Sequence, residues 1–188
     1  MTDQTDNSSG APPDASGIRL RKPTVDDGVA IWKLIADCPP LDQNSVFCNL
    51  LQCAHFAGTC IVAERDGGPV GWISGYLPPA EPETLFIWQV AVHESGRGCG
   101  LAGRMLRGLM ARPECRDVRL MKTTITPDNK GSFALFRSFA SHFDAPFDES
   151  EGFDSEAHFK GLHDSERLIT IGPIPDSRRE RDASRSVA

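Results

Sequence analysis

The sequence predicts one α/β domain of the α+β kind, in which a mixed central sheet is flanked by helices. Three observations favour this class. Two apolar strand patterns at 59–64 and 70–76 are joined by Asp66-Gly67-Gly68, which is typical of an antiparallel hairpin. The strand pattern over 85–92 runs through a glycine-rich loop into a helical pattern, as parallel strand pairing requires. A second strand and helix follow in the same order.

The individual elements follow one another without an internal repeat. Thr24-Val25-Asp26-Asp27 places a cap and an acid before the first helical pattern, and Thr126-Pro127-Asp128-Asn129 caps the last one. Pro78 to Pro82 separates the hairpin from the next strand. In chain order we expect a strand at 18–22, helices at 28–38 and after Asn44, strands at 59–64, 70–76 and 85–92, a helix to about 112, a strand at 118–124, a helix at 130–143 and a strand at 168–171.

The two ends of the chain lack the pattern of a core. Residues 1–17 and 176–188 are polar and aperiodic, so we expect two disordered tails around a folded domain at 18–175. No apolar stretch is long enough for a signal peptide or a membrane span, which favours a cytoplasmic protein without a membrane partner. A net charge of −6 argues against nucleic acid as a partner.

The six cysteines are scattered over predicted helices and strands and form no C-x-x-C pair. This spacing favours reduced thiols over a disulfide framework or a zinc site. We therefore expect no metal in the site.

Arg97 to Gly103 is a glycine-rich turn before a helical pattern, which is typical of an anion site built from backbone amides. Gly98 and Gly100 let the chain turn sharply and point successive N–H groups into one concavity. A Walker loop would need a lysine after the glycines, and none is present. Gly98 to Gly103 matches the dinucleotide fingerprint literally, but that motif opens its fold, whereas about ninety residues precede it here. A glycine-rich helix start without a ligand is the other alternative.

The register R-x-x-G-x-A at Arg97, Gly100 and Ala102 resembles the Q/R-x-x-G-x-G/A signature of the GNAT superfamily of acyl-CoA-dependent N-acetyltransferases. The order of predicted elements resembles that fold over the whole core, with the signal concentrated in 83–140. The resemblance implies that acetyl-CoA is the co-substrate. It also implies that the coenzyme diphosphate is held by Arg97, Gly98, Cys99, Gly100, Leu101, Ala102 and Gly103.

The same resemblance assigns roles to the preceding strand and to the last predicted helix. Val90, Ala91 and Val92 would bind the pantetheine arm through their backbone, and a bulged N–H at Val90 or Val92 would polarise the thioester carbonyl. A plain core strand is the alternative. Asn129 would bond the pantetheine, or it only caps the helix. Many members carry a tyrosine acid on this helix, but Ala134 to Arg137 holds none, so we expect water to suffice for the departing thiolate.

Five segments resemble one branch of this superfamily, the diaminobutyrate acetyltransferases, which are the acetylating enzymes of ectoine biosynthesis. They lie at 40–53, 73–76, 88–92, 123–129 and 163–166.

This second resemblance implies the substrate pocket. Asp42, at the head of the second helix, would hold a substrate ammonium group. Trp88 and Thr126 would wall the pocket beside the thioester, and His163 with Glu166 would complete it. The structural alternatives are a helix cap for Asp42, core for Trp88, a turn for Thr126 and exposed loop for the other two. Phe47 stands where relatives often carry tyrosine, so its role would be packing or stacking.

The implied reaction moves an acetyl group from acetyl-CoA to the γ-amine of L-2,4-diaminobutyrate by direct attack in a ternary complex. No cysteine has an activating context that would favour an acyl-enzyme. The catalytic groups would be the Val90 or Val92 amide, with His163 and Glu166. The γ-ammonium must first lose a proton, and His163, Glu166 and a water chain remain alternatives as its acceptor, so we expect the rate to rise with pH.

The resemblance alone also implies a homodimer and a role in osmotic stress. Two other functions fit the same motifs. One is acetylation of another small diamine or of a protein N-terminus, and the other is acyl-CoA sensing without catalysis.

Overall fold

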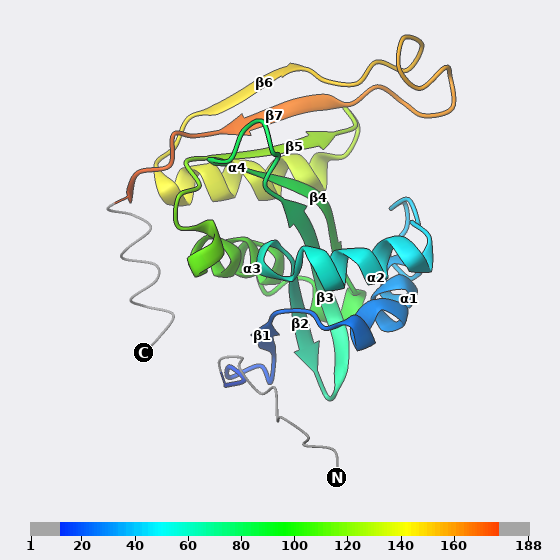
Figure 1. The fold of residues 1–188 in the computed structure, drawn as a ribbon, viewed down its shortest axis with the longest axis vertical. Helices are drawn as coiled ribbons and strands as arrows, with labels where there is room; N and C mark the ends of the chain where they lie inside the picture. The colour runs from blue at the N-terminus through cyan, green and yellow to red at the C-terminus, as the bar shows by residue number, and fades with distance from the viewer. Residues whose placement is uncertain (1–11, 177–188) are drawn as a thin grey trace.

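The structure is a computed structural model that describes residues 12–176, and its centre is a seven-stranded sheet in the order β1-β2-β3-β4-β5-β7-β6 (Figure 1). The strands are β1 (Arg19–Arg21), β2 (Ile61–Arg65), β3 (Gly68–Tyr76), β4 (Thr84–Val92), β5 (Leu120–Ile125), β6 (Phe147–Glu151) and β7 (Arg167–Ile171). The α-helices are α1 (Gly28–Ala36), α2 (Val46–His55), α3 (Leu101–Met110) and α4 (Lys130–Phe143). Among the described strands, β4 and β5 pair in parallel and all other neighbours pair antiparallel, which confirms the expected mixed sheet.

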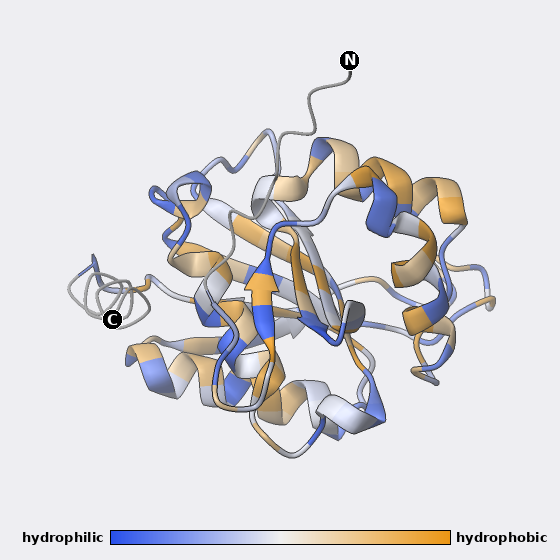
Figure 2. Ribbon diagram, turned by 90° about the horizontal axis from the view of Figure 1, so that it is seen from below, coloured by the Kyte–Doolittle hydropathy of each residue, from blue (hydrophilic) through white to orange (hydrophobic). Residues whose placement is uncertain are grey.

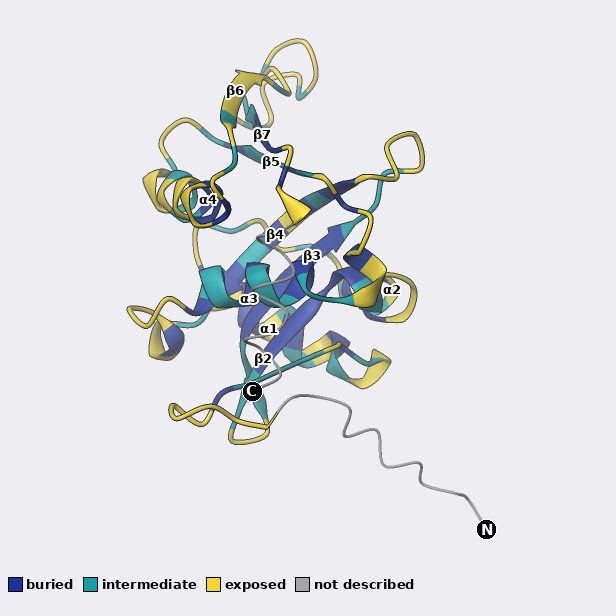
Figure 3. Cartoon of the chain, turned by 90° about the vertical axis from the view of Figure 1, so that its left-hand side faces the viewer, coloured by how far each residue is buried: buried dark blue, intermediate teal, exposed yellow. Residues whose placement is uncertain are grey.

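Helices cover both faces of the sheet, and the alternation along each strand decides which side chains meet them. Ile61 and Ile73 belong to the core formed with α3 and α4. Val62 and Trp72, their neighbours in sequence, belong to the core formed with α1 and α2. Figure 2 shows the apolar stretches of the sheet between these helices, and Figure 3 shows that the central strands are the most buried part of the molecule.

β4 and β5 part in the middle of the sheet. Their parallel pairing ends at Ile87 and Thr123, so residues 88–92 of β4 have no β5 partner. β5 then leads directly into α4, whereas β4 continues toward the glycine loop and α3 (Figure 1). The backbone of residues 88–92 is therefore open on one side.

A β-bulge in β4 lies at the same place. The register with β3 shifts between Ser74 and Gly75, which leaves Trp88 as one extra residue in β4. The bulge reverses the alternation along the strand, so the side chains on the α3 and α4 face come from Leu85 and Ile87 before it and from Val90 and Val92 after it. Gln89 consequently points to the opposite face.

Most predicted elements are present, with ends shifted by a few residues. α4 has the expected bounds, and Asn129 caps it by accepting a hydrogen bond from the Ser132 N–H at 3.0 Å. Asp66 and Gly67 have φ of 52° and 79°, which is typical of a type I′ hairpin turn. The sequence does not predict β6, because Phe147–Glu151 has only one apolar residue and forms an edge strand.

Most of the two predicted tails lies outside the described residues. Residues 14–18 carry a turn in which the Asp14 carboxylate accepts hydrogen bonds from the N–H groups of Ser16 and Ile18. Asp14 also pairs with Arg104 on α3. Contacts with the fold therefore begin before Ile18, the expected start of the domain. In residues 12–176 no helix is long and apolar enough to cross a membrane.

Candidate active site

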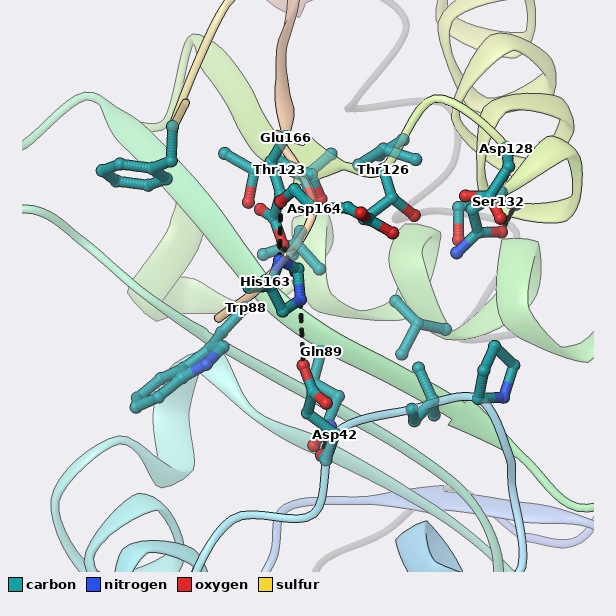
Figure 4. Close-up of a pocket in the computed structure, with 18 of the residues that line it drawn as sticks. Asp42, Trp88, Gln89, Thr123, Thr126, Asp128, Ser132, His163, Asp164 and Glu166 are labelled. Atoms are coloured by element: carbon teal, nitrogen blue, oxygen red, sulfur yellow. Dashed lines mark hydrogen bonds and ion pairs between the residues drawn. The ribbon is translucent and has the colours of Figure 1, made fainter. Parts of the chain in front are cut away.

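A cavity of about 1400 Å³ opens where β4 and β5 part. Its walls come mainly from the loop between α1 and α2 (40–44), from β4 (86–90), from the end of β5 with the start of α4 (123–132), and from the loop between β6 and β7 (153–166). Figure 4 shows side chains of these segments converging on one space. Segments that are far apart in sequence therefore build the site together.

His163 contacts Asp42, Asp164 and Glu166, which also line the cavity. Its Nδ1 lies 2.7 Å from the Asp164 carbonyl oxygen, which can only accept, so Nδ1 carries a proton. Its Nε2 lies 3.2 Å from Asp42 Oδ2 and 4.0 Å from Glu166 Oε1 (Figure 4). The Asp164 carbonyl and then the two carboxylates raise the pKa of His163 above its ordinary 6.5, against the opposing effect of burial. Nε2 is therefore the nitrogen that gains or loses a proton.

The cavity carries an excess of negative charge. Its acidic residues are Asp42, Asp128, Asp164 and Glu166, and its basic residues are Lys130 and His163. Such a lining favours a ligand that carries more than one ammonium group. Within the described part of the chain, no three His, Cys, Asp or Glu side chains are grouped so that they could hold a metal ion.

Aromatic side chains form the wall around Trp88. The Tyr76 ring lies 5.4 Å from Phe86, 6.3 Å from Phe56 and 6.5 Å from Trp88 between centroids. Trp88 is 48% exposed although it lies within a strand, because the bulge places it outside the regular alternation. Trp88 is thus a cavity residue and not a core residue, and Thr126 also lines the cavity.

Asp42 reaches the cavity from a loop. α2 begins at Val46, and Ser45 caps it by accepting a backbone hydrogen bond at 3.1 Å, so the expectation that Asp42 heads this helix is wrong. The Asp42 side chain is 83% exposed. Phe47, which we expected to pack in the pocket, is 67% exposed on the first turn of α2 and is not part of the cavity wall.

The glycine loop lies before α3, outside the lining of this cavity. Gly98 and Gly100 have φ of 79° and 71°, a conformation that other residues rarely adopt. Within residues 12–176 no acceptor contacts the N–H groups of Gly98, Cys99 or Gly100, and a Cβ on either glycine would meet nothing within 4 Å. The Arg97 side chain turns back, with Nε donating to the Val92 carbonyl at 3.0 Å. The loop thus presents its amides to open space, as an anion site requires.

The first turns of two helices supply further polar groups. Leu101, Ala102 and Gly103 form the first turn of α3, where backbone N–H groups have no partner within the helix. Asn129 lines the cavity at the start of α4. Its Oδ1 serves as the helix cap, which leaves its amide nitrogen as the group that a ligand could contact.

Val90, Ala91 and Val92, which follow the bulge, lie in different environments. Val90 lines the cavity and Val92 packs toward α3, whereas Ala91 is fully buried against the α1 and α2 side. The bulge lies at Trp88, so the expectation of a bulged N–H at Val90 or Val92 is wrong. Trp88 through Val92 nevertheless share the open backbone edge of β4.

Among the site residues that sequence reasoning misses, two position its polar groups. Gln89 donates from Nε2 to the Asp42 carbonyl oxygen at 2.8 Å, and Asp164 fixes His163 through its backbone. The broken alternation of apolar residues around Trp88 is the signal that could have found Gln89. No side-chain pattern could have found Asp164, because its carbonyl makes the contact.

Comparison with known proteins places this fold and cavity in a family. Residues 29–140 match the model of the acetyltransferase (GNAT) family. The chain is 47% identical over 157 residues to the L-2,4-diaminobutyric acid acetyltransferase of Methylotuvimicrobium alcaliphilum, which covers 84% of this chain and 91% of that protein. It is 44% identical over 178 residues to the L-2,4-diaminobutyric acid acetyltransferase of Bordetella parapertussis, which covers 92% of this chain and 96% of that protein.

Solved structures give the same result. The diaminobutyrate acetyltransferase EctA from Paenibacillus lautus, in complex with its substrate L-2,4-diaminobutyric acid and coenzyme A, is similar with a TM-score of 0.81 and 41% identity. The similarity covers 84% of this chain and 96% of that one. The chain therefore belongs to the GNAT family of acetyltransferases and, within it, to the L-2,4-diaminobutyric acid acetyltransferases.

Proposed function

We propose that this chain transfers the acetyl group of acetyl-CoA to the γ-amino group of L-2,4-diaminobutyrate, by direct attack of the amine on the thioester. One observation carries the proposal: the acidic cavity lies at the open backbone edge of β4. Asp42, His163 and Glu166 form its polar side, and Trp88 and Val90 lie on the strand beside it. A diammonium substrate is therefore held next to the backbone that receives the thioester.

The residues present fit acetyl-CoA as the acetyl donor. The open amides of Gly98 to Gly103 hold its diphosphate at the start of α3. Val90 and the Val92 N–H hydrogen-bond the pantetheine arm along the free edge of β4, while Ala91 between them pairs with β3 through its backbone. The Asn129 amide nitrogen contacts the arm from α4. The backbone N–H groups of this edge also stabilise the oxyanion that forms when the thioester carbonyl is attacked.

Anchoring of the α-amino end decides which nitrogen is acetylated. Asp42 and Glu166 hold the α-ammonium group, and Trp88 and Thr126 wall the space beside the thioester. With this end fixed, only the γ-nitrogen reaches the carbonyl carbon. Pairing these carboxylates with the ammonium group also compensates both charges when the ligand covers them.

His163 accepts the proton that activates the amine. The γ-ammonium has a pKa of about 10, so it must lose a proton before attack. Neutral His163 takes that proton at Nε2, while Nδ1 stays bonded to the Asp164 carbonyl. The amine then attacks the carbonyl carbon, the C–S bond breaks, and the second proton of the attacking nitrogen passes through water to the leaving thiolate. Because the pKa of His163 is raised, the rate rises with pH through a value above 6.5.

Thiol release from acetyl-CoA tests the proposal directly. The purified protein is assayed with diaminobutyrate, ornithine, lysine and no added amine, and the acetylated nitrogen is identified by NMR. We expect turnover with diaminobutyrate to exceed that with the longer diamines, and acetylation at the γ-nitrogen. Turnover with none of the amines would favour an acyl-CoA sensor, and a strong preference for ornithine would contradict the substrate assignment.

We infer further that the protein is a cytoplasmic homodimer whose product enters ectoine biosynthesis during osmotic stress. The dimer is supported by two exposed apolar side chains on α2 that lie outside the cavity wall, Phe47 and Leu51. Exposed apolar groups of this kind mark protein interfaces. Sedimentation velocity gives the test, because a monomer over the working concentration range would contradict the dimer.

A further inference from the structure

Besides the contact between His163 and the Asp42 carboxylate, three side-chain hydrogen bonds hold the loop that carries Asp42. The Trp32 indole donates to the Asn44 carbonyl at 3.0 Å, and Gln43 Nε2 donates to the Trp32 carbonyl at 3.3 Å. Both of these join the loop to α1, the helix from which it departs. Gln89 Nε2 donates to the Asp42 carbonyl at 2.8 Å and joins the loop to the central strand. The Asp42 side chain is 83% exposed and contacts His163 from the opposite wall, so the bond from Gln89 fixes the backbone point from which the carboxylate reaches the cavity.

The bulge in β4 places Gln89 in this role. Without the extra residue at Trp88, the alternation along β4 would direct Gln89 to the α3 and α4 face, where Val90 and Val92 now lie. With the bulge, Gln89 extends toward the Asp42 loop, as Figure 4 shows. Gln89 and Val90 both line the cavity, and Val90 lies beside the proposed thioester site. One stretch of β4 thus contacts the proposed substrate anchor and also carries the open edge proposed for the acetyl donor.

Ser74 on β3 completes the arrangement. Gln89 is 8% exposed and its Oε1 is buried without a partner among the described residues. Ser74 lies directly opposite in the strand register, is 1% exposed, and its Oγ is also without such a partner. Side chains directly opposite one another on antiparallel strands have Cβ atoms about 4.5–5.5 Å apart. A serine hydroxyl is a donor and a glutamine Oε1 an acceptor, so one water molecule between the two atoms would satisfy both of them.

We propose that Gln89, oriented by Ser74, is a positioning residue that fixes the span between the Asp42 carboxylate and the thioester. It thereby makes the enzyme select a four-carbon diamino acid over longer ones. The proposal rests on the proposed function, because it takes Asp42 as the anchor of the substrate ammonium group. It requires no contact between Gln89 and the substrate.

The expected effect of losing the Gln89 bond follows from how strongly a site of this kind can discriminate diaminobutyrate from ornithine. Diaminobutyrate and ornithine differ by one methylene, which fixed binding groups distinguish by about 10–200-fold. A misplacement of about 1 Å costs up to about 10²-fold in rate. Once the Asp42 loop loses its bond to β4, it can shift outward, so the shorter substrate reacts less well and the longer one fits better. We expect the diaminobutyrate-to-ornithine ratio of kcat/KM to fall about tenfold.

The test replaces Gln89 by methionine, which keeps the length of the side chain and removes the donor. The matched control is Gln52→Met on α2, a second buried glutamine with one amide atom unpartnered among the described residues. Both variants lose a buried amide, so both report any general loss of stability. Only Gln89→Met should lower the substrate ratio and raise the KM for diaminobutyrate. The KM for acetyl-CoA should stay within about twofold in both variants.

Three outcomes decide the proposal. A lowered ratio in Gln89→Met with an unchanged ratio in Gln52→Met supports it. An unchanged ratio in Gln89→Met, or the same change in both variants, overturns it. If Gln89→Met does not fold, Ser74→Ala is measured in its place and is judged by the same ratio. A wild-type protein that does not acetylate diaminobutyrate at all would reject the proposed function instead, which keeps the two failures apart.

Discussion

The two proposed binding regions of this protein are built in opposite ways. The glycine loop is one continuous segment, 97–103, and it offers backbone amides shaped by two glycines in a left-handed conformation. The substrate cavity is assembled from side chains of four distant segments, among them Asp42, Trp88 and His163. Coenzyme binding at the loop should therefore depend on local backbone conformation. Substrate binding and turnover at the cavity should depend on individual side chains and on the contacts that position them.

The largest loss is expected from His163→Ala, which removes a side chain at the centre of the cavity. Loss of a positioned general base lowers rates by about 10²–10⁴-fold, so we expect kcat/KM to fall by at least about a hundredfold. The alkaline rise should disappear as well, because the wild-type profile follows the deprotonation of His163, whose pKa is raised above 6.5. A pH–rate profile of kcat/KM with diaminobutyrate measures both effects.

His158→Ala is the matched control for this variant. His158 lies on the same loop, where its Nδ1 accepts a hydrogen bond from the Asp154 N–H at 2.8 Å, but it is not part of the cavity wall. It should keep the rate and its pH profile. If His163→Ala kept both, the proton would have another acceptor.

A loss of comparable size is expected in stability when Arg21 is replaced by methionine. Arg21 on β1 donates to both Asp27 oxygens at 2.7 Å and to Glu64 Oε2 on β2 at 2.6 Å, and all three side chains are partly buried. Arg21→Met leaves two carboxylates without their main partner, so we expect the free energy of unfolding to fall by about 2–4 kcal/mol. The KM values for acetyl-CoA and diaminobutyrate should stay unchanged in the folded variant. This result would separate a loss of global stability from damage to the active site.

The pH dependence of this variant gives a second measurement. Burial acts to raise the pKa values of Asp27 and Glu64, but the hydrogen bonds from Arg21 bring both below their ordinary 3.8 and 4.5. This stabilisation is present above those ordinary values and is lost as pH falls through the lowered ones. Urea unfolding should therefore show a large difference between wild type and Arg21→Met near neutral pH and a smaller one below about pH 3. A difference that did not change with pH would contradict an ionic origin.

A smaller and more selective loss is expected from Gly100→Val in the loop. Gly100 has a φ of 71°, which a β-branched residue adopts only under strain, so the amides would turn away from the bound diphosphate. We expect the KM for acetyl-CoA to rise at least about tenfold and the KM for diaminobutyrate to change little. Gly103→Ala is the control, because its Cβ would meet only the Arg107 side chain, at 3.4 Å. A dinucleotide fingerprint would require Gly103 as well, so a loss in both variants would contradict the loop assignment.

The difference between the regions also explains what the sequence could predict. A glycine loop between a strand and a helix is a local pattern, and the same is true of the Asp66-Gly67 turn and the Asn129 cap, all of which the structure contains. The pocket residues depend on long-range packing, and residue patterns alone left a structural alternative open for each of them. Resemblance to a family named Asp42 and His163, and the fold brings them within 3.2 Å.

Three features escaped prediction for physical reasons. The strand β6 has few apolar residues, because an edge strand is stabilised by its backbone pairing with β7 and not by burial. The bulge at Trp88 arises from register with β3, a partner that the sequence of β4 does not encode locally. Phe47 occupies the position of a residue expected in the pocket, yet α2 begins only one residue earlier and leaves it exposed.

The smallest effect is expected from Cys99→Ala, and it is the sharpest test of a loop that works through its backbone. The Cys99 thiol is exposed and donates to the Gly96 carbonyl at 3.2 Å, whereas the proposed ligand contact is the Cys99 N–H. Removing the thiol leaves that N–H in place, so the KM for acetyl-CoA should change by less than about twofold, with kcat unchanged. Steady-state kinetics under varied acetyl-CoA measure both values. A loss as large as that of Gly100→Val would mean that the side chain takes part, and a loss of kcat alone would point to an acyl-enzyme on this thiol in place of direct attack.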